Sequence, residues 1–277
     1  MTMCKKNNAN DLSKMININF DFQAEVNGRK QGDAQPYKLV YGSDGAALDW
    51  HRETDSDRYS STLQEYHRIL WSKPLPNGKM FDLVKISQNR LHHASDLGEF
   101  ILSSDRATSV TFAKNKCLLE VISKLPPDTL AAFSKLSDSI GGIIIWPAKR
   151  MRGPTINQAR GFGRTGRMLA DRLDLTVECV RRYYLREPSP LNEVFERYSD
   201  FFRLFVDFRG WVNFFLLQDM VDDDYIAVKI APPFNNFHTP SVPRNVEEYT
   251  LYMEHTVDLI RKRNARIDVW QSSTQAG

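Results

Sequence analysis

Cysteine is scarce in this sequence, because its 277 residues contain only Cys4, Cys117 and Cys179. An odd and sparse set in a chain of this length does not make a disulfide framework. No CxxC or Cys-His spacing is present, so the sequence gives no sign of a structural zinc site. We therefore expect reduced thiols, with Cys117 and Cys179 buried on the apolar faces of helices.

Long apolar runs are also missing. The longest strongly apolar stretches lie at 143–146 and 214–217, whereas a helix needs about 20 apolar residues to span a bilayer. Lys5 and Lys6 near the N-terminus are not followed by an apolar run, so residues 1–15 do not resemble a secretory signal. These features predict a cytoplasmic protein that does not cross a membrane.

Neither sign of charge dominates the chain. The 37 Lys and Arg residues exceed the 34 Asp and Glu residues by a net charge of +3. Hydrophobic residues make up 42% and charged residues 26%, which excludes a fibrous or wholly disordered chain. The near-neutral charge and the lack of a helix-turn-helix signature argue against a sequence-specific DNA-binding protein.

Apolar spacing predicts both helices and strands. Alternation predicts a strand at 16–22, and short apolar runs predict strands at 143–146 and 227–230. Helical spacing predicts an amphipathic helix that begins at Ser189-Pro190 and reaches Phe205, and a terminal helix from Val246 to about Val269. A further helix is expected from Ser61 to about Trp71, with Ser61 and Gln64 as a capping box.

These elements predict an α+β protein, mainly helical and packed on a small mixed sheet. We expect a single domain over residues 16–270, with flexible tails at 1–15 and 271–277. The crowded aromatic residues between Phe201 and Phe215 are expected to form core. They could alternatively form a dimer face.

Positive charge is concentrated between residues 148 and 167. This segment contains no acidic residue and six basic ones, namely Lys149, Arg150, Arg152, Arg160, Arg164 and Arg167. Four glycines allow its backbone to approach a ligand closely, and the guanidinium fork of arginine matches a phosphate. The segment therefore predicts a phosphate-binding loop for a nucleotide, RNA or DNA. The alternative is a solvated loop, or arginines paired with a neighbouring acidic helix.

The candidate ligand residues of this loop are Thr155, Asn157, Arg160, Gly161, Arg164 and Arg167. Residues 161–166 formally match the GxGxxG pattern, but a dinucleotide-binding fingerprint must directly follow a strand and open a crossover helix. Pro154 and a polar stretch separate this match from the nearest expected strand. We therefore do not interpret it as a dinucleotide site.

His92, His93 and Asp96 are the best candidates for acid–base chemistry. A carboxylate near an imidazole can orient the ring and raise its basicity. Adjacent residues of a strand point to opposite sides, so only one of the two histidines can serve a given site. The alternative is a histidine hydrogen-bonded at the start of a strand.

The sequence indicates no metal site and identifies no cofactor. Asp219 and 222–224 form an acidic turn without EF-hand spacing, so we interpret it as a solvated helix end. His67 is expected to be a partly buried, hydrogen-bonded histidine of an apolar helix face. The basic residues 261–263 and Arg266 are expected to stabilise a helix C-terminus and to face water.

Several short segments of the sequence resemble those of a family of bacterial proteins described only as a domain of unknown function. They include YSSTL at 59–63, LWSKPLP at 70–76, LHH at 91–93, SDLG at 95–98, and the pair TIN and ARGF within 155–162. The resemblance extends over roughly 55–270 and implies no activity, substrate or cofactor. Residues 163–169 are richer in Gly and Arg than expected for that family, which favours Thr155, Asn157, Arg160 and Gly161 as ligand residues.

Two functions follow as alternatives. In the first, the loop at 149–167 binds a phosphorylated ligand and His92 or His93, with Asp96, supplies hydrolase- or transferase-type acid–base chemistry. In the second, the protein is a non-catalytic interaction or scaffold protein that forms a homodimer. The sequence alone leaves open whether the protein is an enzyme.

Overall fold

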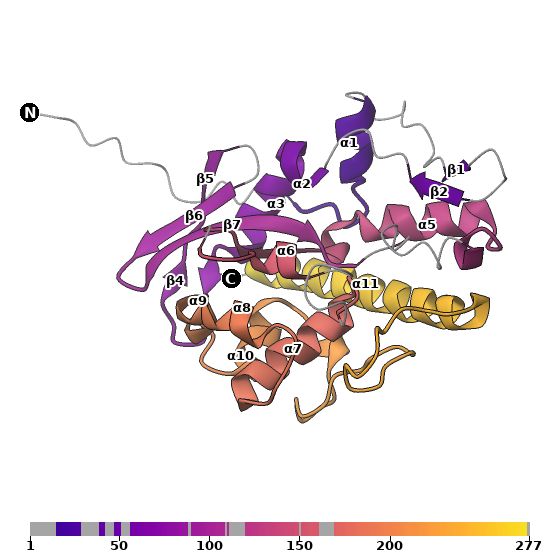
Figure 1. Cartoon of the computed structure of the whole chain (residues 1–277). Helices are drawn as coiled ribbons and strands as arrows, with labels where there is room; N and C mark the ends of the chain where they lie inside the picture. The colour runs from indigo at the N-terminus through magenta and orange to yellow at the C-terminus, as the bar shows by residue number, and fades with distance from the viewer. Residues whose placement is uncertain are drawn as a thin grey trace, which may run out of the picture.

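The computed structural model confirms the α+β class, with helices packed around small sheets (Figure 1). It describes residues 15–28, 39–41, 47–50, 56–87, 90–108, 110, 120–149, 151–160 and 169–275. Within these residues, no helix is long and apolar enough to cross a membrane. Cys179 is buried and free, as expected, whereas Cys117 lies outside the described residues.

A four-stranded sheet organises the first half of the chain. Its strands follow the order β5 (Val84–Ser87), β6 (Arg90–Ser95), β7 (Gly98–Arg106) and β8 (Ile143–Pro147). Every neighbouring pair is antiparallel, so the expected mixed sheet is wrong. The reason is that β8 begins opposite Arg106, where β7 ends, and the chain therefore returns in the reverse direction.

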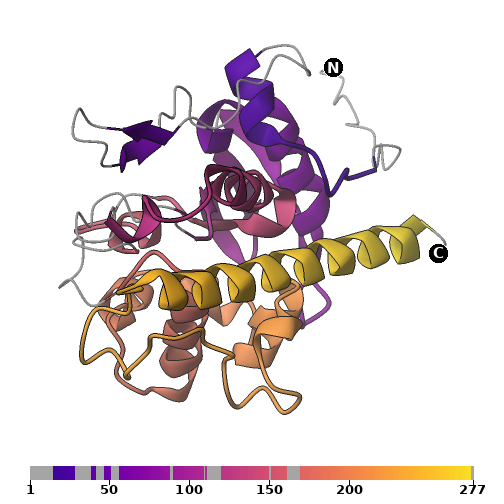
Figure 2. The same cartoon turned by 90° about the vertical axis from the view of Figure 1, so that its right-hand side faces the viewer.

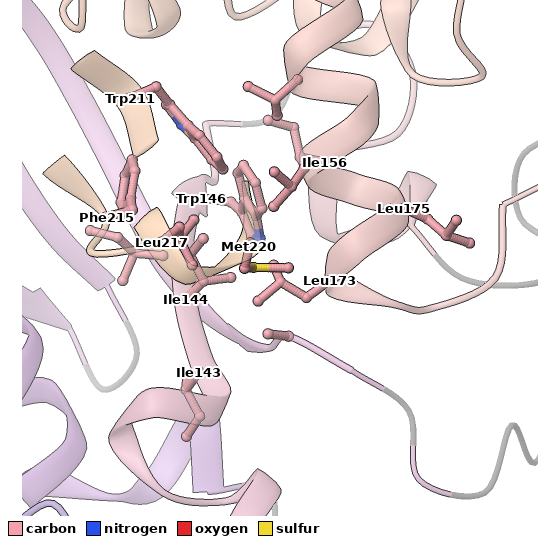
Figure 3. Close-up of a cluster of buried hydrophobic side chains, with 14 of the residues drawn as sticks. Ile143, Ile144, Trp146, Ile156, Leu173, Leu175, Trp211, Phe215, Leu217 and Met220 are labelled. Atoms are coloured by element: carbon pink, nitrogen blue, oxygen red, sulfur yellow. The ribbon is translucent and has the colours of Figure 1, made fainter. Parts of the chain in front are cut away.

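Strand β8 is covered on both faces. All five of its residues are buried, as the apolar run predicts, and the expected strand at 143–146 is confirmed. The indole of Trp146 stacks on that of Trp211, with ring centroids 6.1 Å apart. Figure 3 shows these two rings together with Phe215, Leu217 and Met220. The aromatic residues between Phe201 and Phe215 are core, as expected.

The longest helix, α11 (Val246–Gln275), crosses the molecule (Figures 1 and 2). It lies between the N-terminal half, which includes α5 (Pro127–Ser137), and the later helices, which include α7 (Leu173–Leu185). The expected terminal helix is confirmed and continues beyond Val269. Gln271 is buried and exchanges hydrogen bonds of 2.8 and 3.1 Å with the backbone of Ile16. Helix α11 ends at Gln275, so residues 271–275, which were expected in a tail, are helical.

Helix α11 packs closely on the 3-10 turn η1 (Ile140–Gly142), which leads into β8. The side chain of Asn264 accepts a hydrogen bond from the Gly141 N–H at 2.8 Å. A Cβ atom on Gly141 would lie only 2.5 Å from Asn264 Oδ1. Glycine is therefore needed where α11 meets the start of β8.

The expected continuous helix from Ser189 to Phe205 is wrong. The structure has two short helices instead, α8 (Asn192–Glu196) and α9 (Ser199–Arg203), followed by α10 (Phe208–Phe214). The break falls at Arg197 and Tyr198, whose side chains donate hydrogen bonds to the carbonyls of Pro154 and Lys149. These tertiary bonds override the helical spacing, although the aromatic face remains buried.

Helix α3 (Ser61–Trp71) confirms the expected helix, but its cap is shifted by one residue. The Ser60 hydroxyl, rather than that of Ser61, accepts the N–H of Leu63 at 2.9 Å. The helix ends just before the two-stranded ribbon of β3 (Lys73–Pro74) and β4 (Met80–Phe81). Trp71, the last residue of α3, is thus only two residues before Lys73, the first residue of β3.

Two expected strands are absent from the described residues. Residues 16–22 contain a turn and the start of α1 (Phe22–Gly28), because the Asp21 carboxylate accepts the Ala24 N–H and starts a helix. Residues 227–230 form only an isolated bridge from Val228, since Asp222 accepts the nearby backbone N–H groups. The remaining elements are β1 (Leu39–Tyr41), β2 (Ala47–Trp50), α2 (Ser56–Tyr59), α6 (Ile156–Ala159) and η2 (Gln218–Met220).

Candidate functional site

The three predicted acid–base residues share the β6–β7 hairpin, but the two histidines lie on opposite faces. His93 is 2% exposed, with its Nδ1 2.8 Å from the Asp82 carbonyl and its Nε2 2.8 Å from the Ser95 hydroxyl. His92 lies on the other face, with its Nε2 3.0 Å from Glu99 Oε1. Because both ring nitrogens of His93 are engaged with the protein, its environment is that of a core histidine.

Asp96 is exposed in the turn between β6 and β7. Its carboxylate pairs with Lys79, and this hydrogen bond holds the pKa of the carboxyl below its usual range. The ion pair is open to water on both sides, so its contribution to stability is small. The pairing with Lys79 orients the carboxylate toward β4.

Arg160 is buried and bound on all sides by protein groups. Its Nε donates to Thr176 Oγ1 at 3.0 Å, and its terminal nitrogens pair with Asp105 and Asp171. It also donates to the Ala107 carbonyl at 2.6 Å. These bonds join the end of β7 to α7, so the described contacts of Arg160 are internal ones.

Thr155 and Asn157 position α6 beside the same strand end. Thr155 and Gln158 form a capping box, and the Asn157 amide donates to the Ser104 carbonyl at 3.3 Å. His93 instead pairs with Phe100, four residues and therefore about 13 Å along β7 from Ser104. The predicted acid–base residue His93 and the predicted ligand residue Asn157 thus contact different parts of β7.

Three predicted ligand residues, Gly161, Arg164 and Arg167, lie outside the described residues, as does Arg150. Of the described basic residues in this loop, Lys149 and Arg152 are exposed and Arg160 is buried. Phosphate binding by the loop stays a prediction.

A different basic residue, Lys73, occupies the most distinctive polar environment that the structure describes. Lys73 is 9% exposed, and its Nζ lies over three aromatic rings. The distances from Nζ to the ring centroids are 4.8 Å for Trp71, 4.8 Å for Phe214 and 5.3 Å for Trp270. The rings come from α3, α10 and α11, so three helices converge on one amine.

Two further basic side chains lie behind Lys73. Arg263 is buried and donates to the carbonyls of Gly141, Ile143 and Phe215, while its Nη2 has no hydrogen-bond partner. His67 Nδ1 accepts the Trp71 indole N–H at 3.0 Å, and its buried Nε2 has no partner. We call Lys73, Arg263 and His67 the basic cluster.

Burial and mutual repulsion shift the pKa values of the basic cluster. Removal from water, together with the positive charge of Arg263, lowers the pKa of Lys73 to about 7 and that of His67 to about 3. Burial alone lowers the pKa of Arg263 to about 9. Among the described residues, no carboxylate forms an ion pair with Lys73 or Arg263. At neutral pH the positive charge of the cluster is therefore on Arg263 and in part on Lys73, while His67 is neutral, and no described carboxylate pairs with that charge.

Lys73 lines a pocket of about 400 Å³. Its walls come from the Pro74–Pro76 segment, from Asn213 and Phe214 at the end of α10, and from Leu216 and Trp270. Gly210 also lines the pocket, and a Cβ atom there would lie 2.0 Å from the Phe205 carbonyl oxygen and 3.0 Å from Pro76 Cγ. The arrangement offers one amine and one amide among apolar walls, which can hold an amphiphilic small molecule.

The predicted acidic turn is engaged by neighbouring protein groups. Asp219 pairs with Arg266, which lowers the pKa of the carboxyl, and Asp222 accepts backbone N–H groups. Among the described residues, no group of three or more His, Cys, Asp or Glu side chains is arranged to hold a metal ion.

The expectations for two residues of the basic cluster need correction. Arg263 was expected to face water but is 3% exposed, and His67 is fully rather than partly buried. The signal for Arg263 is present in the sequence: it lies three residues after Ile260 and four before Ile267, both buried, and hence on the apolar stripe of α11.

The fold and the site together define an α+β protein with a pocket that Lys73, Phe214 and Trp270 line, formed by the β3 segment, α10 and α11. Residues 16–267 match the family of unknown function DUF6994, and the chain belongs to that family. The resemblance to a domain-of-unknown-function family is thereby confirmed, and the family description names no activity. Neither the curated proteins nor the solved structures contain a match to this chain.

Proposed function

We propose that this protein binds a small organic anion, with a carboxylate or phosphate head and an apolar body, in the pocket beside Lys73. The observation that carries the proposal is the positive basic cluster, which lacks a carboxylate partner among the described residues. A buried charge without a partner destabilises a fold, and a bound anion would compensate it.

Electrostatics favours an anionic head at this position. Two opposite charges about 4 Å apart attract by about 4 kcal/mol at an effective dielectric constant of 20. Arg263 adds to the positive potential, since it lowers the pKa of Lys73. Anion binding would stabilise the ammonium form of Lys73 and raise its pKa, so binding above pH 7 takes up a proton.

The size and walls of the pocket restrict the ligand. A volume of about 400 Å³ lies within the range of small-molecule sites and is too small for a nucleic-acid segment. Pro74, Leu216 and Trp270 present apolar surface. These walls favour an aromatic or aliphatic acid, or a small phosphate ester, whose apolar part packs against them.

The test uses benzoate and phenyl phosphate as anionic probes and benzyl alcohol as a neutral probe. Calorimetry and intrinsic tryptophan fluorescence report binding, because Trp71 and Trp270 contact Lys73. We expect the anions to bind and the alcohol not to. Their affinity should fall by up to about tenfold per pH unit above pH 7, as Lys73 loses its charge. Lys73→Met should abolish binding, whereas Lys85→Met, on the exposed edge strand β5, should not. Equal binding by Lys73→Met would overturn the proposal.

The Arg- and Gly-rich loop at 149–167 is a second candidate phosphate site. Residues 148–167 contain six basic residues and no acidic one, which supports this site. Two of the basic residues, Lys149 and Arg152, are exposed. A thermal-shift screen with nucleotides and short RNA or DNA tests this site. Stabilisation that survives Arg164→Ala and Arg167→Ala would exclude the loop as its cause. Loss of hydrolytic activity in His92→Ala would support the predicted acid–base role.

The scaffold alternative is also a proposal, although the aromatic residues between Phe201 and Phe215 are buried in the core. Light scattering that reports a dimer, combined with no response to any probe, would favour it over ligand binding. A cytoplasmic location is proposed from the sparse cysteines, and cell fractionation tests it.

A further inference from the structure

We propose that Lys73 is a nucleophilic amine that forms an imine with a 2-oxo acid bound in the pocket. The inference rests on the proposed function, because it requires that the pocket hold a small organic anion. It goes further in assigning a covalent reaction to one atom and a carbonyl to the ligand.

The geometry places the amine for such a reaction. Lys73 Nζ has no hydrogen-bond or carboxylate partner among the described residues, and its side chain lines the pocket. Trp71, Phe214 and Trp270 surround it with ring atoms that cannot accept its protons as oxygen would. A ligand in the pocket would therefore approach the side chain of Lys73, which lines it.

The charge state supports the same role. With a pKa of about 7, roughly three-quarters of the amine is neutral at pH 7.5, whereas an ordinary lysine is almost entirely protonated. A lysine activated by desolvation and a neighbouring cation is a known route to a nucleophilic amine. The faces of the three rings act in the opposite direction and favour the ammonium, so a measurement of the Lys73 pKa would show which effect dominates.

The basic cluster also selects the ligand class. A carboxylate next to the carbonyl would place a negative charge beside the developing iminium and within the field of Arg263. Leu216 and Trp270 would contact the apolar side chain of the ligand. Together these features fit a 2-oxo acid with an aromatic or branched side chain.

The reaction balances without an oxidant or a cofactor. The lone pair of the neutral amine attacks the carbonyl carbon, a C–N bond forms, and the carbonyl π electrons move to oxygen. The nitrogen loses a proton and the oxygen gains one, which gives a carbinolamine. The C–O bond then breaks, the oxygen leaves as water with the second amine proton, and C=N forms. Amine and ketone have become imine and water.

Reductive trapping tests the proposal on the full-length protein. Phenylpyruvate and cyanoborohydride are added, and intact mass spectrometry and peptide mapping locate the reduced adduct. We expect one adduct, on Lys73, whose rate of formation at pH 7 exceeds that of any other lysine by more than tenfold. Phenyllactate, which has the carboxylate but no carbonyl, should bind, slow the trapping and give no adduct.

Matched variants separate the two proposals. Lys73→Arg keeps the positive charge and removes the nucleophile, so it should retain phenyllactate binding and lose the adduct, while Lys85→Arg should behave as the parent protein. Phenyllactate binding without a Lys73 adduct overturns the imine alone. Adducts spread evenly over surface lysines also overturn it, and this result needs no variant. Absence of binding by phenyllactate and the other anions, with no Lys73 adduct, overturns the proposed function as well.

Discussion

Lys73 and Arg263 share one aromatic ring: both cations lie over the indole of Trp71, at 4.8 and 5.6 Å from its centroid. They come from β3 and α11, which are almost 200 residues apart in the chain. Stacking on a common ring brings two like charges close in a buried place, where their repulsion is weakly screened. Burial is the larger cause of the lowered pKa of Lys73, and the charge of Arg263 lowers that pKa further.

Arg263→Met should raise the pKa of Lys73, because the substitution removes the nearby positive charge. NMR of the Lys73 side-chain nitrogen, followed over pH 5–11, measures this value. Arg263→Lys keeps a charge but loses the planar fork that binds three carbonyls, so it separates charge from packing. Arg261→Met, on the exposed face of α11, is the control. An unchanged pKa in Arg263→Met contradicts this account.

The contribution of Lys73 to stability should rise with pH between about 7 and 10.5. Lys73 has a lowered pKa in the folded state and an ordinary one in the unfolded state, so the unfolded chain binds the extra proton in this window. The slope due to Lys73 is up to about 1.4 kcal/mol per pH unit. Urea unfolding of the parent protein and of Lys73→Met at matched pH values measures this slope as the difference between the two free energies of unfolding. Parallel pH curves for the two proteins would exclude a lowered pKa.

The sequence predicts those elements whose pattern agrees with their packing. The apolar run at 143–146 and the long periodic stretch from Val246 both became the expected elements, since a buried strand and a core helix need little beyond such patterns. The helix from Ser189 was predicted as continuous because bonds from Arg197 and Tyr198 to distant carbonyls leave no trace in the local spacing.

The basic cluster was not predictable in the same way. Arg263 lies almost 200 residues from His67 and Lys73 and meets them only through packing, so no spacing rule joins the three side chains. Charge concentration instead drew attention to the loop around Arg160, whose guanidinium binds Asp105 and Asp171. A basic residue on an apolar helical stripe, as at Arg263, is the more informative signal.

Gly210→Ala should destabilise the protein and reshape the pocket. The new methyl group would lie 2.0 Å from the Phe205 carbonyl oxygen, a backbone atom that cannot rotate away, and 3.0 Å from Pro76 Cγ. We expect a loss of about 1–3 kcal/mol, typical of overpacking, and weaker binding of phenyl phosphate. Gly78→Ala is the comparison for backbone strain without a clash, since a Cβ there meets nothing within 4 Å but the positive φ strains an alanine by about 1–2 kcal/mol. A smaller loss at Gly210 than at Gly78 would show that the close contact relaxes freely.

Arg160→Met should reduce the free energy of unfolding by about 3–5 kcal/mol, because it removes the buried cation that pairs with Asp105 and Asp171. Asp105, the Thr176 hydroxyl and the Ala107 carbonyl would each lose a donor from the guanidinium. Arg152→Met is the matched control, since Arg152 is exposed in the same loop and should change stability by less than about 0.5 kcal/mol. Urea unfolding with and without a phosphate-bearing probe distinguishes the two roles of Arg160. A stable Arg160→Met protein that has lost only ligand binding would show that the arginine serves a ligand, whereas a large loss of stability in the ligand-free protein would show that it joins β7 to α7.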